Sequence, residues 1–111
     1  MESIVEYRDF VFSGNTWDGF KVGVTVNGTS KDLTNTEAQI AFREGSTTGT
    51  LMFVMTTPQN IEVKDNKYVI KPIKIDFPAG LYVGDMEITD ADSTKTYLRI
   101  FLTVNTTTNG L

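Results

Sequence analysis

The chain of 111 residues contains neither cysteine nor histidine, and these two absences narrow its chemistry. Without cysteine there is no disulfide and no thiolate-bound metal. Without histidine there is no Ser–His or Cys–His nucleophile pair and no histidine-ligated metal, so catalysis would have to rest on carboxylates, lysine or tyrosine. No glycine-rich phosphate loop opens a helix either. We therefore expect no enzyme activity, no catalytic residues, no cofactor and no bound metal.

Positive charge is also scarce. Ten Lys and Arg residues stand against fourteen Asp and Glu residues, which gives a formal net charge of -4. An acidic protein repels phosphate backbones and anionic lipids, so we expect neither nucleic acid nor membranes as partners. The start of the chain carries Glu2 where a signal peptide carries bases, and no run reaches the length of a transmembrane helix. These features predict a soluble protein synthesised in the cytoplasm.

Apolar residues recur with a period of two along most of the chain. The clearest run extends over residues 20–26, where Phe and Val alternate with Lys, Gly and Thr before the turn pair Asn27-Gly28. The same alternation marks residues 38–43, 51–55, 73–77, 82–88 and 97–104. Period-two patterning is typical of strands with one face against a core.

Turn residues separate these runs at intervals of roughly 8 to 12 residues, the spacing of a β-sandwich or barrel. We predict an all-β fold of two antiparallel sheets with about seven to nine strands. The length indicates a single domain over residues 1–111. The polar segment 105–111 is expected to be a frayed tail.

Several predicted strands carry apolar residues on both faces. Met52, Val54, Val83, Tyr97 and Phe101 fall opposite the expected core rows of their strands. A lone sandwich needs only one apolar face in each sheet, so these five residues form a candidate interface with another chain. The alternative is ordinary scatter of apolar residues over a protein surface. The sequence leaves both interpretations open.

Two further features invite a functional interpretation. Trp17 is the only Trp and follows a polar turn, so it is either a ligand-stacking aromatic or, as we favour, a residue of the core or its rim. Asp85 and Glu87 share one face of a predicted strand, a spacing compatible with paired-carboxylate hydrolysis. Alternating charge is also what an exposed strand face looks like, and we favour that interpretation.

Two long stretches carry a family resemblance. One begins at Ser13-Gly14-Asn15-Thr16-Trp17-Asp18-Gly19-Phe20 and continues to Asp32-Leu33-Thr34 and the strand that ends at Arg43. The other joins Pro78-Ala79-Gly80-Leu81-Tyr82 to residues 96–104. Their order resembles small virion structural proteins of phages and prophages, related to the N-terminal domain of the phage baseplate upper protein. The resemblance extends over about residues 8 to 105.

That resemblance implies an immunoglobulin-like β-sandwich that assembles with other virion proteins and with copies of itself, so a homo-oligomer is expected. It implies location in the virion, after synthesis in the cytoplasm of the bacterial host, and brings no catalytic residues. A baseplate, tail or head-fibre module is thus the first hypothesis. The alternative is a carbohydrate- or surface-binding sandwich that uses Trp17, and the third is a hydrolase that uses Asp85 and Glu87.

Overall fold

The computed structural model describes residues 5–91 and 93–106. These residues form twelve strands and no helix, which confirms the predicted all-β class. The strands are β1 (Val5–Phe12), β2 (Thr16–Trp17), β3 (Phe20–Val22), β4 (Thr25–Val26), β5 (Thr29–Ser30), β6 (Glu37–Glu44), β7 (Leu51–Thr56), β8 (Ile61–Lys64), β9 (Lys67–Ile70), β10 (Ile73–Lys74), β11 (Gly80–Thr89) and β12 (Thr94–Asn105).

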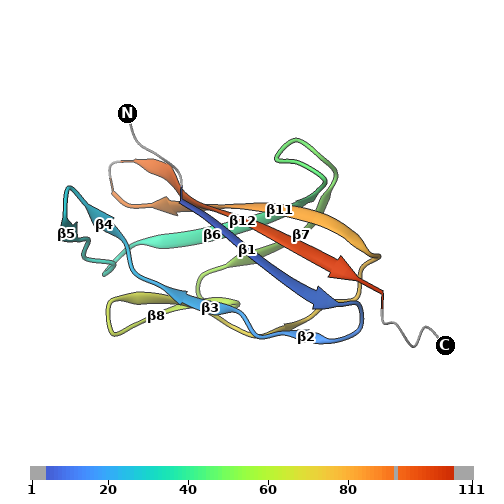
Figure 1. The fold of residues 1–111 in the computed structure, drawn as a ribbon. Coiled ribbons are helices and arrows are strands. Elements are labelled where there is room, and N and C mark those ends of the chain that lie inside the picture. The colour runs from blue at the N-terminus through green and yellow to red at the C-terminus, as the bar shows by residue number, and fades with distance from the viewer. Residues whose placement is uncertain (1–4, 92, 107–111) are drawn as a thin grey trace.

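The five longest strands form one large sheet in the order β1-β12-β11-β6-β7. A three-stranded sheet, β3-β9-β8, and the two short pairs β10-β2 and β4-β5 make up the rest. In Figure 1, β2, β3 and β8 run below the strands of the large sheet, which places the chain in two layers. Buried side chains from both layers belong to one core cluster.

The architecture corrects the prediction in two respects. The described residues form twelve strands in four sheets rather than about seven to nine strands in two, because short strands break up the smaller layer. The prediction of antiparallel sheets is wrong at one edge, where β1 lies parallel to β12 with Val5 opposite Leu98 and Phe12 opposite Asn105. Alternation marks the face of a strand but not its direction, so the sequence pattern could not show this.

Alternation does explain the core. Ile40 and Phe42 of β6 face the same layer as Ile100 and Leu102 of β12, and all four side chains have 0% of their surface exposed. Gly84 of β11 leaves room for them, since a Cβ there would lie 2.9 Å from side-chain atoms of Ile40 and Phe42. Removing such side chains from water is the main source of stability in a fold of this size.

Local turn chemistry fixes the hairpins. Asn27 and Gly28 have φ values of 52° and 79°, as the predicted turn requires, and they join β4 to β5. The run over residues 20–26 nevertheless splits at Gly23 and Val24 into β3 and β4. At the other end of the chain, Asn105 still pairs in β12, while residues 107–111 of the predicted tail lie outside the described residues.

Candidate functional site: the outer face of the large sheet

The side chains of the large sheet that point away from the core form the surface that we call the outer face. Strand register arranges them in rows across the sheet. The successive rows are Phe10–Thr103–Leu81, Arg8–Phe101–Val83–Arg43–Leu51, Glu6–Arg99–Asp85–Ala41–Val54 and Thr96–Glu87–Gln39–Thr56. The outer face is therefore a mixture of apolar and charged groups.

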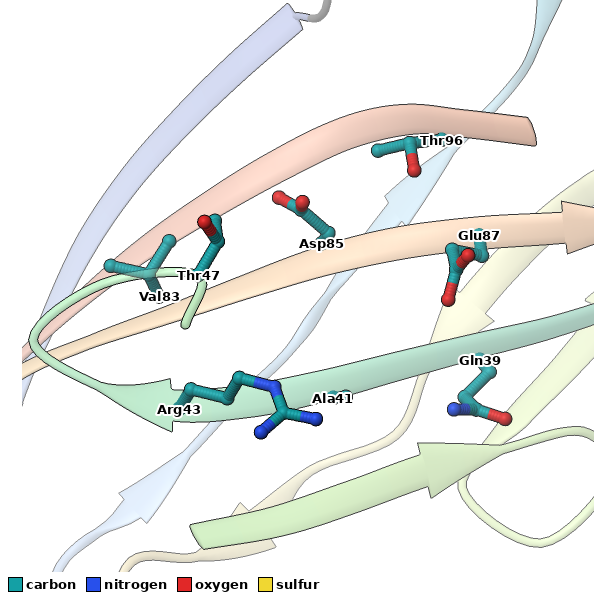
Figure 2. Close-up of a pocket in the computed structure, with 8 residues that line it drawn as sticks. All are labelled: Gln39, Ala41, Arg43, Thr47, Val83, Asp85, Glu87 and Thr96. Atoms are coloured by element: carbon teal, nitrogen blue, oxygen red, sulfur yellow. The ribbon is translucent and has the colours of Figure 1, made fainter. Parts of the chain in front are cut away.

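Three of the five predicted interface residues lie on the outer face. Val54 is 39% exposed on β7, and Phe101 is partly buried on β12. Val83 also faces outward but is only 3% exposed. Figure 2 shows Thr47, from the loop between β6 and β7, close to Val83, so this loop covers part of the sheet.

The prediction that Met52 and Tyr97 point away from the core is wrong. Both side chains are partly buried and pack against the core cluster. Each sits at a β-bulge. The register shifts between Phe42 and Arg43, where Met52 is the unpaired residue, and between Met86 and Glu87, where Tyr97 is. A bulge inserts one extra residue and so reverses the alternation beyond it. Strict period-two counting therefore assigned these two side chains to the wrong face.

Sequence reasoning missed three exposed apolar residues on the same face. Phe10 is 62% exposed, Leu51 is 47% exposed and Leu81 is 40% exposed. For Phe10 a signal was present, because Glu6, Arg8 and Phe10 alternate with the half-buried Tyr7 and Asp9 and the buried Val11. For Leu51 there was none, since the bulge at Met52 turns it outward.

A shallow groove crosses the middle of the outer face (Figure 2). Its volume is about 220 Å³ and it is lined by Gln39, Ala41, Arg43, Thr47, Val83, Asp85, Glu87 and Thr96. Arg43 donates to the Gly49 carbonyl at 3.2 Å, which ties the strand to the loop beside it. The groove brings acidic, basic and amide side chains together along β6 and β11.

The acidic pair from the sequence analysis lies in this groove, but its two members differ. Asp85 accepts two hydrogen bonds from Arg99, at 2.7 and 3.1 Å, and this contact raises the pKa of the Arg99 guanidinium above its ordinary value. Bidentate arginine–carboxylate pairs combine two parallel charged hydrogen bonds and fix the geometry of both groups. Glu87 is exposed on the same strand. Asp85 is thus engaged in a cross-strand ion pair, whereas Glu87 is open to solvent.

A cation–π contact joins Arg8 of β1 to Phe101 of β12 on the outer face. The guanidinium carbon of Arg8 lies 4.3 Å from the ring centroid of Phe101, its partner in register on the neighbouring strand. Such a contact is worth about 0.5–1 kcal/mol at an exposed site. Arg8 also makes a 3.2 Å ion pair with Glu6 two residues earlier. The basic side chains of this face are therefore held in defined positions.

Trp17 lies in the core, as the favoured interpretation expected. Its side chain is 2% exposed, and its ring meets that of Phe42 edge-on with centroids 5.8 Å apart. The indole Nε1 donates to Asp9 Oδ2 at 2.9 Å, which satisfies the polar edge of the ring. A ring buried in this way has no open face on which a sugar could stack.

Comparisons with known proteins identify no relative of the chain: no family model matches it, and no curated protein matches it. Among the described residues, no cluster of three or more acidic side chains is placed to hold a metal ion. No helix long and apolar enough to cross a membrane occurs in the same part of the chain.

Proposed function

We propose that this chain is a structural module of a phage or prophage particle, which acts by binding other virion proteins through the outer face of its large sheet. The observation that carries the proposal is the first row of that face. Phe10 and Leu81 are 62% and 40% exposed on two strands that flank Thr103 of β12. Exposed aromatic and aliphatic groups gathered on one face are typical of protein interfaces.

The strand order supports the immunoglobulin-like part of the proposal. In a variable-type immunoglobulin fold, one sheet carries strands G, F, C and C′ and the other carries B, E and D. Here β12, β11, β6 and β7 are adjacent in that order, and β3, β9 and β8 form the second sheet. We assign the two layers to this architecture on that correspondence.

A tyrosine near the start of β11 gives the same assignment a second support. Tyr82 is 1% exposed, and its hydroxyl donates to the Pro78 carbonyl at 2.6 Å, four residues upstream. Immunoglobulin-like domains carry such a tyrosine corner at the start of strand F. Much of the resemblance to virion proteins lies in residues 78–82. In the structure this segment forms the corner that the Tyr82–Pro78 hydrogen bond closes.

The two other hypotheses have less support. A carbohydrate-binding patch depended on Trp17, whose ring is buried. A carboxylate hydrolase depended on Asp85 and Glu87, of which Asp85 is paired with Arg99. The groove on the outer face is open to solvent along one side, a shape better suited to contact with a protein surface than to enclosing a small substrate.

Particle composition tests the proposal directly. In a strain whose phage or prophage encodes the chain, we expect mass spectrometry of purified particles to find the protein. The double variant Phe10→Ser/Leu81→Ser is expected to lower its amount per particle at least about fivefold, because apolar anchors dominate interface energy. Val63→Ser is the matched control, since Val63 is 42% exposed on β8 of the other layer.

Two results would contradict the proposal. One is the absence of the wild-type chain from purified particles. The other is equal incorporation of the wild type and the Phe10→Ser/Leu81→Ser variant while both remain folded by circular dichroism.

A further inference from the structure

The outer strand of the large sheet, β1, has one edge that no other strand pairs with among the described residues. It pairs only with β12, so the backbone groups on its opposite side face outward. One of these edge positions is already occupied, because the Phe10 amide donates to Asp9 Oδ1 at 2.9 Å. The stretch of β1 left open for pairing within the described chain is therefore Val5–Asp9, with Tyr7 at its centre.

The charges along this stretch complement themselves about that centre. If a second copy pairs antiparallel with Tyr7 opposite its own counterpart, Glu6 of each chain lies opposite Arg8 of the other. Both side chains are on the outer face, 52% and 67% exposed. Residues directly opposite on antiparallel strands have Cβ atoms about 5 Å apart, so two cross-strand ion pairs form across the two-fold axis.

Neighbouring registers lack this match. A shift that centres the axis on Arg8 sets two Arg8 side chains against each other, and one that centres it on Glu6 sets two carboxylates against each other. Like charges directly opposite are destabilising. Charged residues on an edge strand often serve to prevent pairing, but β1 carries both signs at positions that a two-fold axis exchanges.

We propose that two copies of the chain pair through the edges of β1, over Val5–Asp9, with reciprocal Glu6–Arg8 ion pairs. The inference rests on the proposed function, because it names a second copy as one partner of the same assembly surface. Pairing would join the two large sheets into one continuous sheet and set the two outer faces side by side. In the unpaired chain the Arg8 guanidinium lies over the Phe101 ring of β12, so the reciprocal ion pairs require it to turn toward the open edge of β1.

Charge reversal with complementation tests the pairing on the full chain. Sedimentation equilibrium of the wild type is expected to show a monomer–dimer equilibrium. The variants Glu6→Arg and Arg8→Glu should each weaken the dimer about tenfold or more, because each sets like charges in opposition across the interface. An equimolar mixture of the two variants should dimerise again, since each chain then offers the charge that the other lacks. The double variant Glu6→Arg/Arg8→Glu should also recover.

Matched controls come from an ion pair elsewhere. Lys74 and Asp76 lie 4.0 Å apart and are 66% and 73% exposed, at β10 and the residue after Ile75, outside the Val5–Asp9 stretch. Lys74→Glu and Asp76→Arg change the net charge by the same amounts as the β1 variants and should leave the dimer unchanged. The variant Glu6→Arg/Arg8→Glu lacks the Arg8–Phe101 contact, as Arg8→Glu does. If it dimerises again, the loss of the dimer in Arg8→Glu comes from opposed charges and not from a damaged fold.

Three outcomes would overturn the pairing. The wild type could stay monomeric at every concentration, the dimer could tolerate Arg8→Glu, or Lys74→Glu could weaken the dimer as much as Arg8→Glu does. The proposed function is judged separately by particle composition. A monomer that still enters particles through Phe10 and Leu81 removes only the pairing, whereas a β1 dimer absent from particles removes only the virion role.

Discussion

Asp9 shows how much one half-buried side chain can organise. Its Oδ2 accepts from Trp17 Nε1 at 2.9 Å and from the Tyr7 hydroxyl at 3.4 Å, and its Oδ1 accepts from the Phe10 amide. The residue thus links the core tryptophan to the open edge of β1. Hydrogen bonds to a charged acceptor are stronger than neutral ones, so the indole contact should contribute measurably to stability.

Replacing Trp17 with Phe keeps an aromatic ring but removes the donor to Asp9. We expect the free energy of unfolding to fall by about 2–3 kcal/mol, from the lost charged hydrogen bond and the smaller ring. Urea unfolding followed by far-ultraviolet circular dichroism measures it. Asp9→Asn and the double variant complete a double-mutant cycle, and a coupling energy near zero would contradict the role given to this bond.

Three tyrosines make the fold sensitive to alkali. Burial raises the pKa values of Tyr7, Tyr68 and Tyr82 above their ordinary 10.0, and Asp9 adds to the effect at Tyr7 as Glu44 does at Tyr82. The unfolded chain therefore releases these protons first as the pH rises. Their contribution to stability is fully present below pH 10.0 and is lost as the pH rises through the folded-state pKa values.

Denaturant unfolding at a series of pH values, with tyrosinate absorbance recorded in parallel, checks this prediction. We expect the midpoint to decline above about pH 10 and the absorbance to titrate later in the folded protein than in denaturant. A midpoint that stays level while all the tyrosines ionise would show that these phenols are not protected by the fold.

Among the elements, the strands were predictable and the bulges were not. Alternation located the cores of β6, β11 and β12, because their buried residues repeat with a period of two over most of each strand. The bulges at Met52 and Tyr97 depend on how two strands meet, which no single run of sequence records. For the same reason the sequence placed Val54 and Phe101 on the outer face, where the structure also has them, but missed Leu51.

The bulge on β12 gives a testable contrast between two residues once assigned to the same surface. Tyr97 packs against the core and lines an apolar hollow with Val24, Met86 and Ile88, whereas Val54 is 39% exposed on the outer face. Tyr97→Ala should therefore lower the free energy of unfolding by about 2–3 kcal/mol, and Val54→Ala by less than about 1 kcal/mol. If urea titrations gave equally small losses of stability for Tyr97→Ala and Val54→Ala, the placement of Tyr97 against the core would be contradicted.

At the scale of the whole molecule, a chain of aromatic rings connects the two layers. Phe42 of β6 meets Trp17 edge-on and stacks on Phe53 of β7 at 4.7 Å, and Phe53 continues through Phe77 to Tyr82 of β11. Trp17 and Phe42 lie far apart in the sequence and in different sheets, and Phe53 and Phe77 also come from distant segments, so these two contacts form only when the chain folds as a whole. Long-range contacts of this kind favour unfolding as one cooperative unit.

Phe42 joins Trp17 to the rings of the large sheet, and its removal tests whether the layers depend on each other. Phe42→Ala should lower the free energy of unfolding by about 3–5 kcal/mol, because it leaves a cavity between β6 and the buried Trp17. Trp17 fluorescence reports the packing between layers, and far-ultraviolet circular dichroism reports the strands. We expect the two transitions to coincide in both the wild type and the variant. A fluorescence change that precedes the loss of strands would mean that the smaller layer separates from an intact large sheet, and that the outer face can persist without the core that the two layers share.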